Sequence, residues 1–278
     1  MLLTAPVLVK PRIQFRSFAP FLLISFGLAW GILGLYIFLP EQMGAVFGPL
    51  TGNHPLFYLA VYAPAIAAFI LVVRTGGQEG LLCFLRRALL WRCSISWYAF
   101  LILGIPLIFI SGSALRGNLF TEPFPFASFP SLLTALCLAA VKGPMEEFGW
   151  RGLALPLLQR KFAPFQSGLI LGVIWGLWHL PAFLLSGTQQ SEWSFTAFFL
   201  GCLAISVIAT ALFNRSHGSI LLSAFFHFSL MNPVFPDAQP YDTYLLVVAS
   251  VMIVWANRRD MFARQGGVVE VIPERIRA

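Results

Sequence analysis

The chain has 278 residues, of which 58% are hydrophobic and only 10% are charged. Soluble domains carry about 45–50% apolar and about 25% charged residues, so a soluble fold could not bury this much apolar surface and lipid must surround most of the chain. The net charge of +7 does not indicate nucleic acid, because the basic residues lie between apolar segments and near the termini. The composition predicts a single membrane domain, residues 1–278.

Eight apolar segments could cross a membrane, since a membrane helix needs roughly 20 mostly apolar residues. They are predicted at 18–39, 55–73, 96–113, 131–158, 164–185, 195–213, 219–233 and 243–258. The predicted fold class is therefore all-α, a polytopic transmembrane bundle of about eight spans. The polar residues of the middle spans place a catalytic core at 131–233.

The charges in the loops alternate. One set of loops is basic and contains Lys10, Arg12, Arg16, Arg74, Arg86, Arg87, Arg92, Arg160, Lys161, Arg215, Arg258 and Arg259. The alternate set contains Glu41, Glu122, Glu192, Asp237 and Asp242, with Arg116 as its only basic residue. Because basic loops stay in the cytoplasm, we expect both termini there, in a plasma membrane that we take to be bacterial.

Segments outside the spans give three further expectations. Residues 78–92 are amphipathic with a basic face and predict a helix lying on the cytoplasmic surface. The polar tail from Asp260 is expected to be loosely ordered. The four cysteines form no CxxC pair, so neither a disulfide framework nor a thiolate zinc site is expected.

Four charged residues lie inside the segment 131–158: Lys142, Glu146, Glu147 and Arg151. Unpaired charges at mid-membrane cost roughly 2.5–3.5 kcal/mol each, so they must face protein or a water-filled cavity. Glu147 and Arg151 are four residues apart and can pair, whereas Glu146 points about 100° away and can face a cavity. Lys142 could pair with Glu146 or extend along the wall of the bundle, and Pro144 is expected to kink the helix.

Two histidines lie in neighbouring spans. Trp175 and His179 share one face of the segment 164–185, and His227 in the segment 219–233 is followed by Asn232. Depths counted from the cytoplasmic ends at 1.5 Å per residue allow Glu146, His179 and His227 to meet near the middle of the bilayer.

This set supports two kinds of hydrolytic site. A carboxylate with a neutral histidine can deprotonate water, while a second histidine and an amide donate to an oxyanion. Alternatively, two histidines and a glutamate can bind zinc and leave a position open for water. Each residue alone has a structural explanation, a helix-to-helix hydrogen bond or a helix-stabilising pair. Their combination on three consecutive spans favours catalysis, whereas His54 and His217 lie near loops and need no special role.

Three motifs resemble those of the CPBP (CAAX prenyl protease and bacteriocin-processing) family of intramembrane proteases. MEEFGWRG at 145–152 is similar to its EExxxR motif, WGLWHLP at 175–181 to its FxxxH motif, and NRSHGSILLSAFFHFSLMN at 214–232 to its histidine- and asparagine-containing third motif. The resemblance covers roughly residues 74–233. EExxxR alone is weakly specific, whereas the three motifs in this order on consecutive spans are strongly so.

The resemblance implies an intramembrane endopeptidase, of the type II CAAX prenyl endopeptidase kind, with a peptide or membrane-protein substrate. Glu146 would activate water with help from His179, His227 and Asn232 would polarise the scissile carbonyl, and Glu147 and Arg151 would hold the site in shape. This mechanism requires no cofactor. The family is commonly labelled metalloprotease, so the resemblance also allows zinc bound by Glu146, His179 and His227.

Two positions depart from the family pattern. Trp175 stands where the family usually has phenylalanine, and Met231 stands where it has asparagine, with Asn232 one residue later. This offset turns the amide about 140° away from His227 on a regular helix. The sequence therefore also allows a non-proteolytic binding or scaffold protein. A proton-coupled transporter is the third hypothesis, although no repeated halves are evident. The substrate could be a CAAX protein, a bacteriocin or another membrane peptide.

Overall fold

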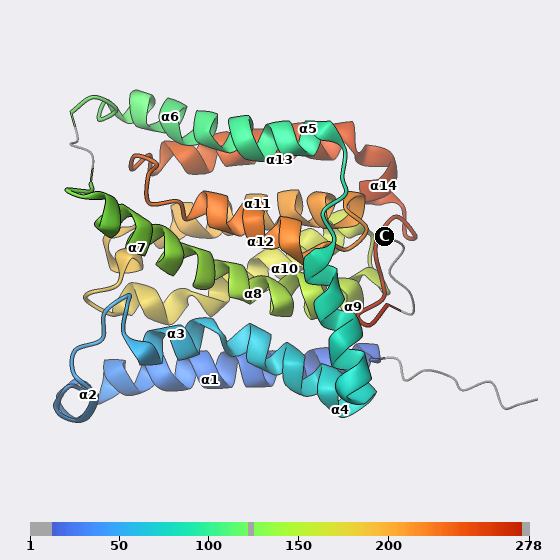
Figure 1. Ribbon diagram of the computed structural model, residues 1–278, viewed down its shortest axis with the longest axis horizontal. Coiled ribbons are helices and arrows are strands. Elements are labelled where there is room, and N and C mark those ends of the chain that lie inside the picture. The colour runs from blue at the N-terminus through green and yellow to red at the C-terminus, as the bar shows by residue number, and fades with distance from the viewer. Residues whose placement is uncertain (1–12, 122–124, 274–278) are drawn as a thin grey trace, which may run out of the picture.

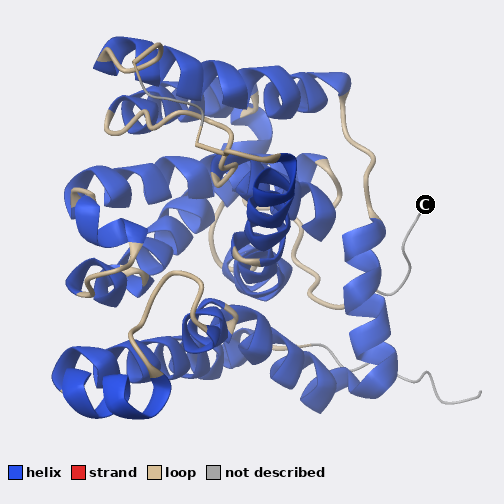
Figure 2. Cartoon of the chain, turned by 60° about the vertical axis from the view of Figure 1, so that its left-hand side comes forward, coloured by secondary structure: helices blue, strands red, loops and turns tan. Residues whose placement is uncertain are grey.

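The computed structural model describes residues 13–121 and 125–273, so Lys10, Arg12 and Glu122 of the charge pattern lie outside the described residues. The described part is built from helices, with no strand (Figure 2). Most helices run along the long axis of the molecule (Figure 1). In chain order they are α1 (Phe18–Phe38), α2 (Pro40–Phe47), α3 (Pro55–Val61), α4 (Ala63–Leu85), α5 (Ile95–Ala99), α6 (Ile105–Arg116), α7 (Phe129–Val141), α8 (Gly143–Gly149), α9 (Leu155–Gln159), α10 (Pro164–Trp178), α11 (Phe195–Arg215), α12 (Ile220–Leu230), α13 (Tyr241–Ala256) and α14 (Arg258–Phe262).

The helices confirm the predicted all-α membrane fold. Five continuous helical stretches are long and apolar enough to cross a membrane, and two shorter apolar helices, α12 and α13, accompany them. Large apolar side chains such as Phe38 and Leu23 are exposed on the outside of the bundle, as expected where the solvent is lipid. The predicted segment 55–73 differs in detail, because it divides at Tyr62 into α3 and α4.

The predicted segment 131–158 is also broken. α7 ends at Val141, and Lys142 has the non-helical backbone angles φ −81° and ψ −90°. Pro144 lies in the first turn of α8, where its missing N–H removes no helical hydrogen bond. The proline therefore starts a helix, and the change of direction that we expected at Pro144 falls at Lys142. One π-helical turn, η4 (Trp150–Ala154), then links α8 to α9.

Glycines bring α10 and α11 into close contact. A Cβ atom at Gly168, Gly172 or Gly176 would lie 2.9 Å or less from an atom of α11. These glycines repeat every four residues and so form one stripe along α10. Small residues at this spacing let membrane helices approach closely. The contact fixes the end of α10, and with it His179, against the rest of the bundle.

The prediction of a surface helix at 78–92 is wrong in one respect, because one of its basic side chains is buried in the protein. Its first half continues α4 beyond a sharp turn at Gly77, where φ is +61°, and a 3₁₀ turn, η2 (Arg86–Leu89), follows. Leu82 and Leu89 point outward, whereas Arg87 is buried with 2% of its surface exposed. The amphipathic pattern correctly indicated two faces, but Arg87 lies on the side facing protein.

The described part of the C-terminal tail is anchored through Glu270 and Val271, contrary to the expectation of loose order. Arg87 donates from Nη1 to the backbone oxygens of Glu270 and Val271, at 3.1 Å each. The same guanidinium donates to the oxygens of Gly152 and Gly218, and Val271 is buried in the core. Arg87 therefore joins the tail to the π-helical turn that follows the two glutamates.

Candidate active site

Glu146 is a buried carboxylate held by two indoles. Its Oε2 atom accepts hydrogen bonds from Nε1 of Trp175 at 2.8 Å and Nε1 of Trp150 at 3.2 Å. Only 4% of its surface is exposed. These two donors fix the orientation of the carboxylate, while its Oε1 atom has no hydrogen-bond partner among the described residues.

Glu147 has different partners from Glu146, and it links α8 to α12. Its Oε1 atom accepts from Nη1 of Arg151 at 3.0 Å and from Nδ1 of His227 at 2.8 Å. The predicted pairing with Arg151 is confirmed. Because an ionised carboxylate only accepts, Nδ1 of His227 must carry a proton, and Nε2 lies on the other side of the ring.

His179 is held in a similar way by a different partner. It caps the C-terminal end of α10, and its Nδ1 atom lies 2.8 Å from the backbone oxygen of Trp175. A carbonyl oxygen only accepts, so this contact places the proton on Nδ1. Nε2 of the neutral ring is then a bare nitrogen that can accept a proton.

Trp175 joins these groups into one cluster. Besides donating to Glu146, its ring centre lies 5.3 Å from that of His179 and 5.5 Å from that of His227. The guanidinium of Arg151 lies 5.2 Å from the same ring centre. We call Glu146, Glu147, Arg151, Trp175, His179 and His227 the Trp175 cluster. The structure thus brings the predicted glutamate and both histidines together from α8, α10 and α12.

Asn232 is placed differently from the other predicted site residues. It follows the end of α12, and its side-chain oxygen accepts from the backbone N–H of Val234 at 3.1 Å. The side chain of Met231 lies near Nε2 of His227. A Cβ atom at Gly143 would lie 2.3 Å from Met231 Sδ and 2.6 Å from His227 Nε2. Gly143 therefore leaves the space that these two side chains fill.

Lys142 does not pair with Glu146, since no ion pair between them occurs among the described residues. Its ammonium group lies over the rings of Phe57 and Tyr58, at 5.6 Å and 5.3 Å from their centres. His54 caps α3 by accepting from the N–H of Leu56. These contacts give both residues structural roles.

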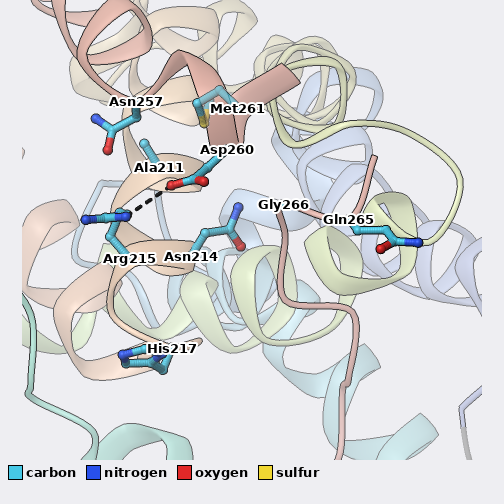
Figure 3. A pocket seen from close by; sticks show the side chains of 9 residues that line it. All are labelled: Ala211, Asn214, Arg215, His217, Asn257, Asp260, Met261, Gln265 and Gly266. Carbon is cyan, nitrogen blue, oxygen red and sulfur yellow. Dashed lines mark hydrogen bonds and ion pairs between the residues drawn. The ribbon is translucent and has the colours of Figure 1, made fainter. Parts of the chain in front are cut away.

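His217 lies away from the Trp175 cluster, as we expected. It lines a polar cavity of about 430 Å³ together with Asn214, Arg215, Asn257 and Asp260 (Figure 3). In this cavity Arg215 pairs with Asp260 at 3.0 Å. None of the predicted site residues lines it.

The zinc binding that the sequence left open stays a prediction. Among residues 13–121 and 125–273, no three histidine, cysteine, aspartate or glutamate side chains lie close enough together to hold one metal ion. The hydrogen bonds of Glu146 Oε2 to two indoles, and the separate partners of the two histidines, agree with this finding. All four cysteines are free.

Three parts of the site were not predicted from the sequence. Trp150 lies four residues after Glu146, at the spacing that puts two side chains on one helix face, so its contact was detectable in principle. Trp175 was expected on the face of His179, but its hydrogen bond to Glu146 crosses between helices. The role of Gly143 depends on the approach of α12, for which the sequence carries no local signal.

The fold and the buried charges define a class of protein, a polytopic helical membrane protein with a polar cluster enclosed between its helices. Within that class, residues 128–232 match the family described as Type II CAAX prenyl endopeptidase Rce1-like. CAAX prenyl protease 2 of Methanococcus maripaludis is 28% identical over 180 residues, which are 60% of this chain and 65% of the archaeal protein. The chain therefore spans slightly less than two thirds of that relative. The resemblance drawn from the three motifs is confirmed.

Proposed function

We propose that the chain is an intramembrane endopeptidase whose active site is the Trp175 cluster. The observation that carries this proposal is the arrangement of Glu146, His179 and His227 around one indole. Each of the three is held by hydrogen bonds at one atom, and among the described residues no hydrogen bond engages Oε1 of Glu146 or Nε2 of either histidine. Groups held in this way need little reorganisation during a reaction.

In the proposed reaction, a water molecule binds between Oε1 of Glu146 and Nε2 of His179. Glu146 takes a proton as the water oxygen bonds to the scissile carbonyl carbon, and the carbonyl electron pair moves onto its oxygen. A doubly protonated His227 donates from Nε2 to this oxyanion, and Glu147 and Arg151 hold its ring. The C–N bond then breaks, and the leaving amine takes the proton from Glu146.

The name of the archaeal relative suggests a substrate class for this chain. A CAAX protein ends in a cysteine, two aliphatic residues and a variable residue, and its cysteine carries a prenyl group. Each buried CH₂ of a lipid chain contributes about 0.8 kcal/mol to membrane binding. Such a peptide would therefore concentrate in the membrane that surrounds the site. Peptide substrate and lipid are the partners in this proposal, in a plasma membrane with both termini in the cytoplasm.

A cleavage assay tests the proposal. The purified chain in detergent is incubated with a fluorogenic farnesylated peptide that ends in a CAAX sequence, and with the same peptide lacking the farnesyl group. We expect faster cleavage of the farnesylated peptide, with the cut bond identified by mass spectrometry. If both peptides and a general peptide library remain intact, the chain is not an endopeptidase. Binding of the farnesylated peptide without cleavage would then favour the scaffold hypothesis.

A further inference from the structure

Among the described residues, the position four residues after His227 on α12 carries no hydrogen-bond donor. Met231 follows His227 by four residues on α12, and its sulfur lies next to Nε2 of His227 over Gly143. A thioether sulfur is a weak acceptor and has no hydrogen to donate. The amide oxygen of Asn232 accepts a hydrogen bond from the backbone N–H of Val234 in the loop beyond the helix. An oxyanion at this place would receive one hydrogen bond from His227 and none from its neighbour.

Trp175 has a donor close to this place. Its ring centre lies 5.5 Å from that of His227, with the two rings nearly perpendicular. Its N–H reaches Oε2 of Glu146, the residue that we propose activates the water. Trp150 also donates to Glu146, but its ring packs on Phe21 and Trp178 instead of His227. Of the two indoles at Glu146, Trp175 is therefore the one in contact with both histidines.

We propose that the indole N–H of Trp175 donates to the oxyanion together with His227, which makes Trp175 a catalytic residue of the proposed endopeptidase reaction. In the resting site this N–H donates a hydrogen bond to the ionised carboxylate of Glu146. When Glu146 takes the proton from water, its negative charge disappears and a negative charge appears on the carbonyl oxygen. Hydrogen bonds to ionised acceptors are the stronger ones, so the N–H shifts to the oxyanion. When the C–N bond breaks and the amine takes the proton, Glu146 is ionised again and the N–H returns.

Two pairs of variants separate this role from simple positioning of Glu146. Trp175→Phe removes the N–H and should lower kcat about 10²–10³-fold, the usual effect of losing one oxyanion donor, with little change in KM. Adding Met231→Asn to Trp175→Phe places an amide beside Nε2 of His227 and should raise kcat at least tenfold above that of Trp175→Phe alone. Trp150→Phe removes the other donor to Glu146, and Met231→Asn should not rescue it.

Two further variants complete the test. Trp178→Phe removes an equally buried indole N–H that donates to the backbone oxygen of Ser25, and its kcat should stay within a few-fold of the original. Asn232→Ala should also stay within a few-fold, a result that does not depend on whether Trp175→Phe folds. Thermal unfolding in detergent confirms that each variant is folded.

All variants are assayed with the farnesylated peptide, and their kcat values either support or overturn the proposal. Rescue of Trp175→Phe and not of Trp150→Phe by Met231→Asn supports the proposal. Failure to rescue Trp175→Phe, or equal rescue of both, overturns it. A loss of 10²–10³-fold in Asn232→Ala would assign the second donor to Asn232 and overturn it as well. If the unaltered chain cleaves no peptide, the proposed function itself fails.

Discussion

Oε1 of Glu147 lies 2.8 Å from Nδ1 of His227, so the second glutamate of α8 holds a histidine of α12 in place. The same oxygen also accepts a hydrogen bond from Nη1 of Arg151. At most 6% of the surface of any of these three residues is exposed. Glu147 is therefore the common acceptor of two buried donors, which separates its role from that of the neighbouring Glu146.

Replacing Glu147 should destabilise the protein. Glu147→Gln leaves Arg151 as a buried charge without its partner, a change that costs about 3–5 kcal/mol, and we expect a clear fall in Tm in detergent. Asp260→Asn is the matched control, because it breaks the half-exposed ion pair with Arg215 (Figure 3), and exposed pairs contribute about 0–1 kcal/mol. An equal Tm for Glu147→Gln and the unaltered protein would contradict the assigned role.

Replacing Arg87 should release the C-terminal tail. Arg87→Met keeps much of the side-chain volume but removes the hydrogen bonds to Glu270 and Val271. We expect trypsin to cut the tail after Arg264 much faster than in the unaltered protein. Arg86→Met is the control, because Arg86 is exposed and no bond from it to the tail is among the described contacts. Identical cleavage rates for the two variants would show that the tail is held by other contacts.

The alternation of loop charges predicts the topology. In a background with the four native cysteines replaced by serine, a cysteine at Gln239 should react with a membrane-impermeant maleimide added to intact cells. A cysteine at Arg264 should react only after the cells are opened, because the basic loops are expected in the cytoplasm. Labelling of both positions in intact cells would refute this topology.

The sequence predicted the elements that follow from local spacing and hydropathy. The positions of the helices follow from the apolar segments, and the pair Glu147–Arg151 from the i, i+4 spacing. The burial of Arg87 could not be predicted, because an amphipathic pattern shows two faces without showing which of them meets lipid. The break at Lys142 and the hydrogen bond from Trp175 to Glu146 depend on how separate helices pack. Tertiary contacts of this kind leave no periodic signal in the sequence.

Histidines outside the Trp175 cluster should be dispensable for turnover. His217→Ala and His54→Ala should both keep kcat within a few-fold of the original in the farnesylated-peptide assay. His54→Ala removes the cap of α3 and should cost about 0.5–2 kcal/mol of stability, which a slightly lower Tm would reveal. A large loss of kcat in either variant at unchanged folding would mean that the active site lies elsewhere.

The most direct test of the account is single-turnover cleavage of the farnesylated peptide by Glu146→Gln. The substitution keeps the size of the side chain and an oxygen that can accept from Trp175, but it removes the base. A positioned base contributes about 10²–10⁴-fold, so we predict a loss of that size with an unchanged Tm. Glu41→Gln, at an exposed position of α2, should retain full activity. Cleavage by Glu146→Gln at the rate of the unaltered protein would contradict the account.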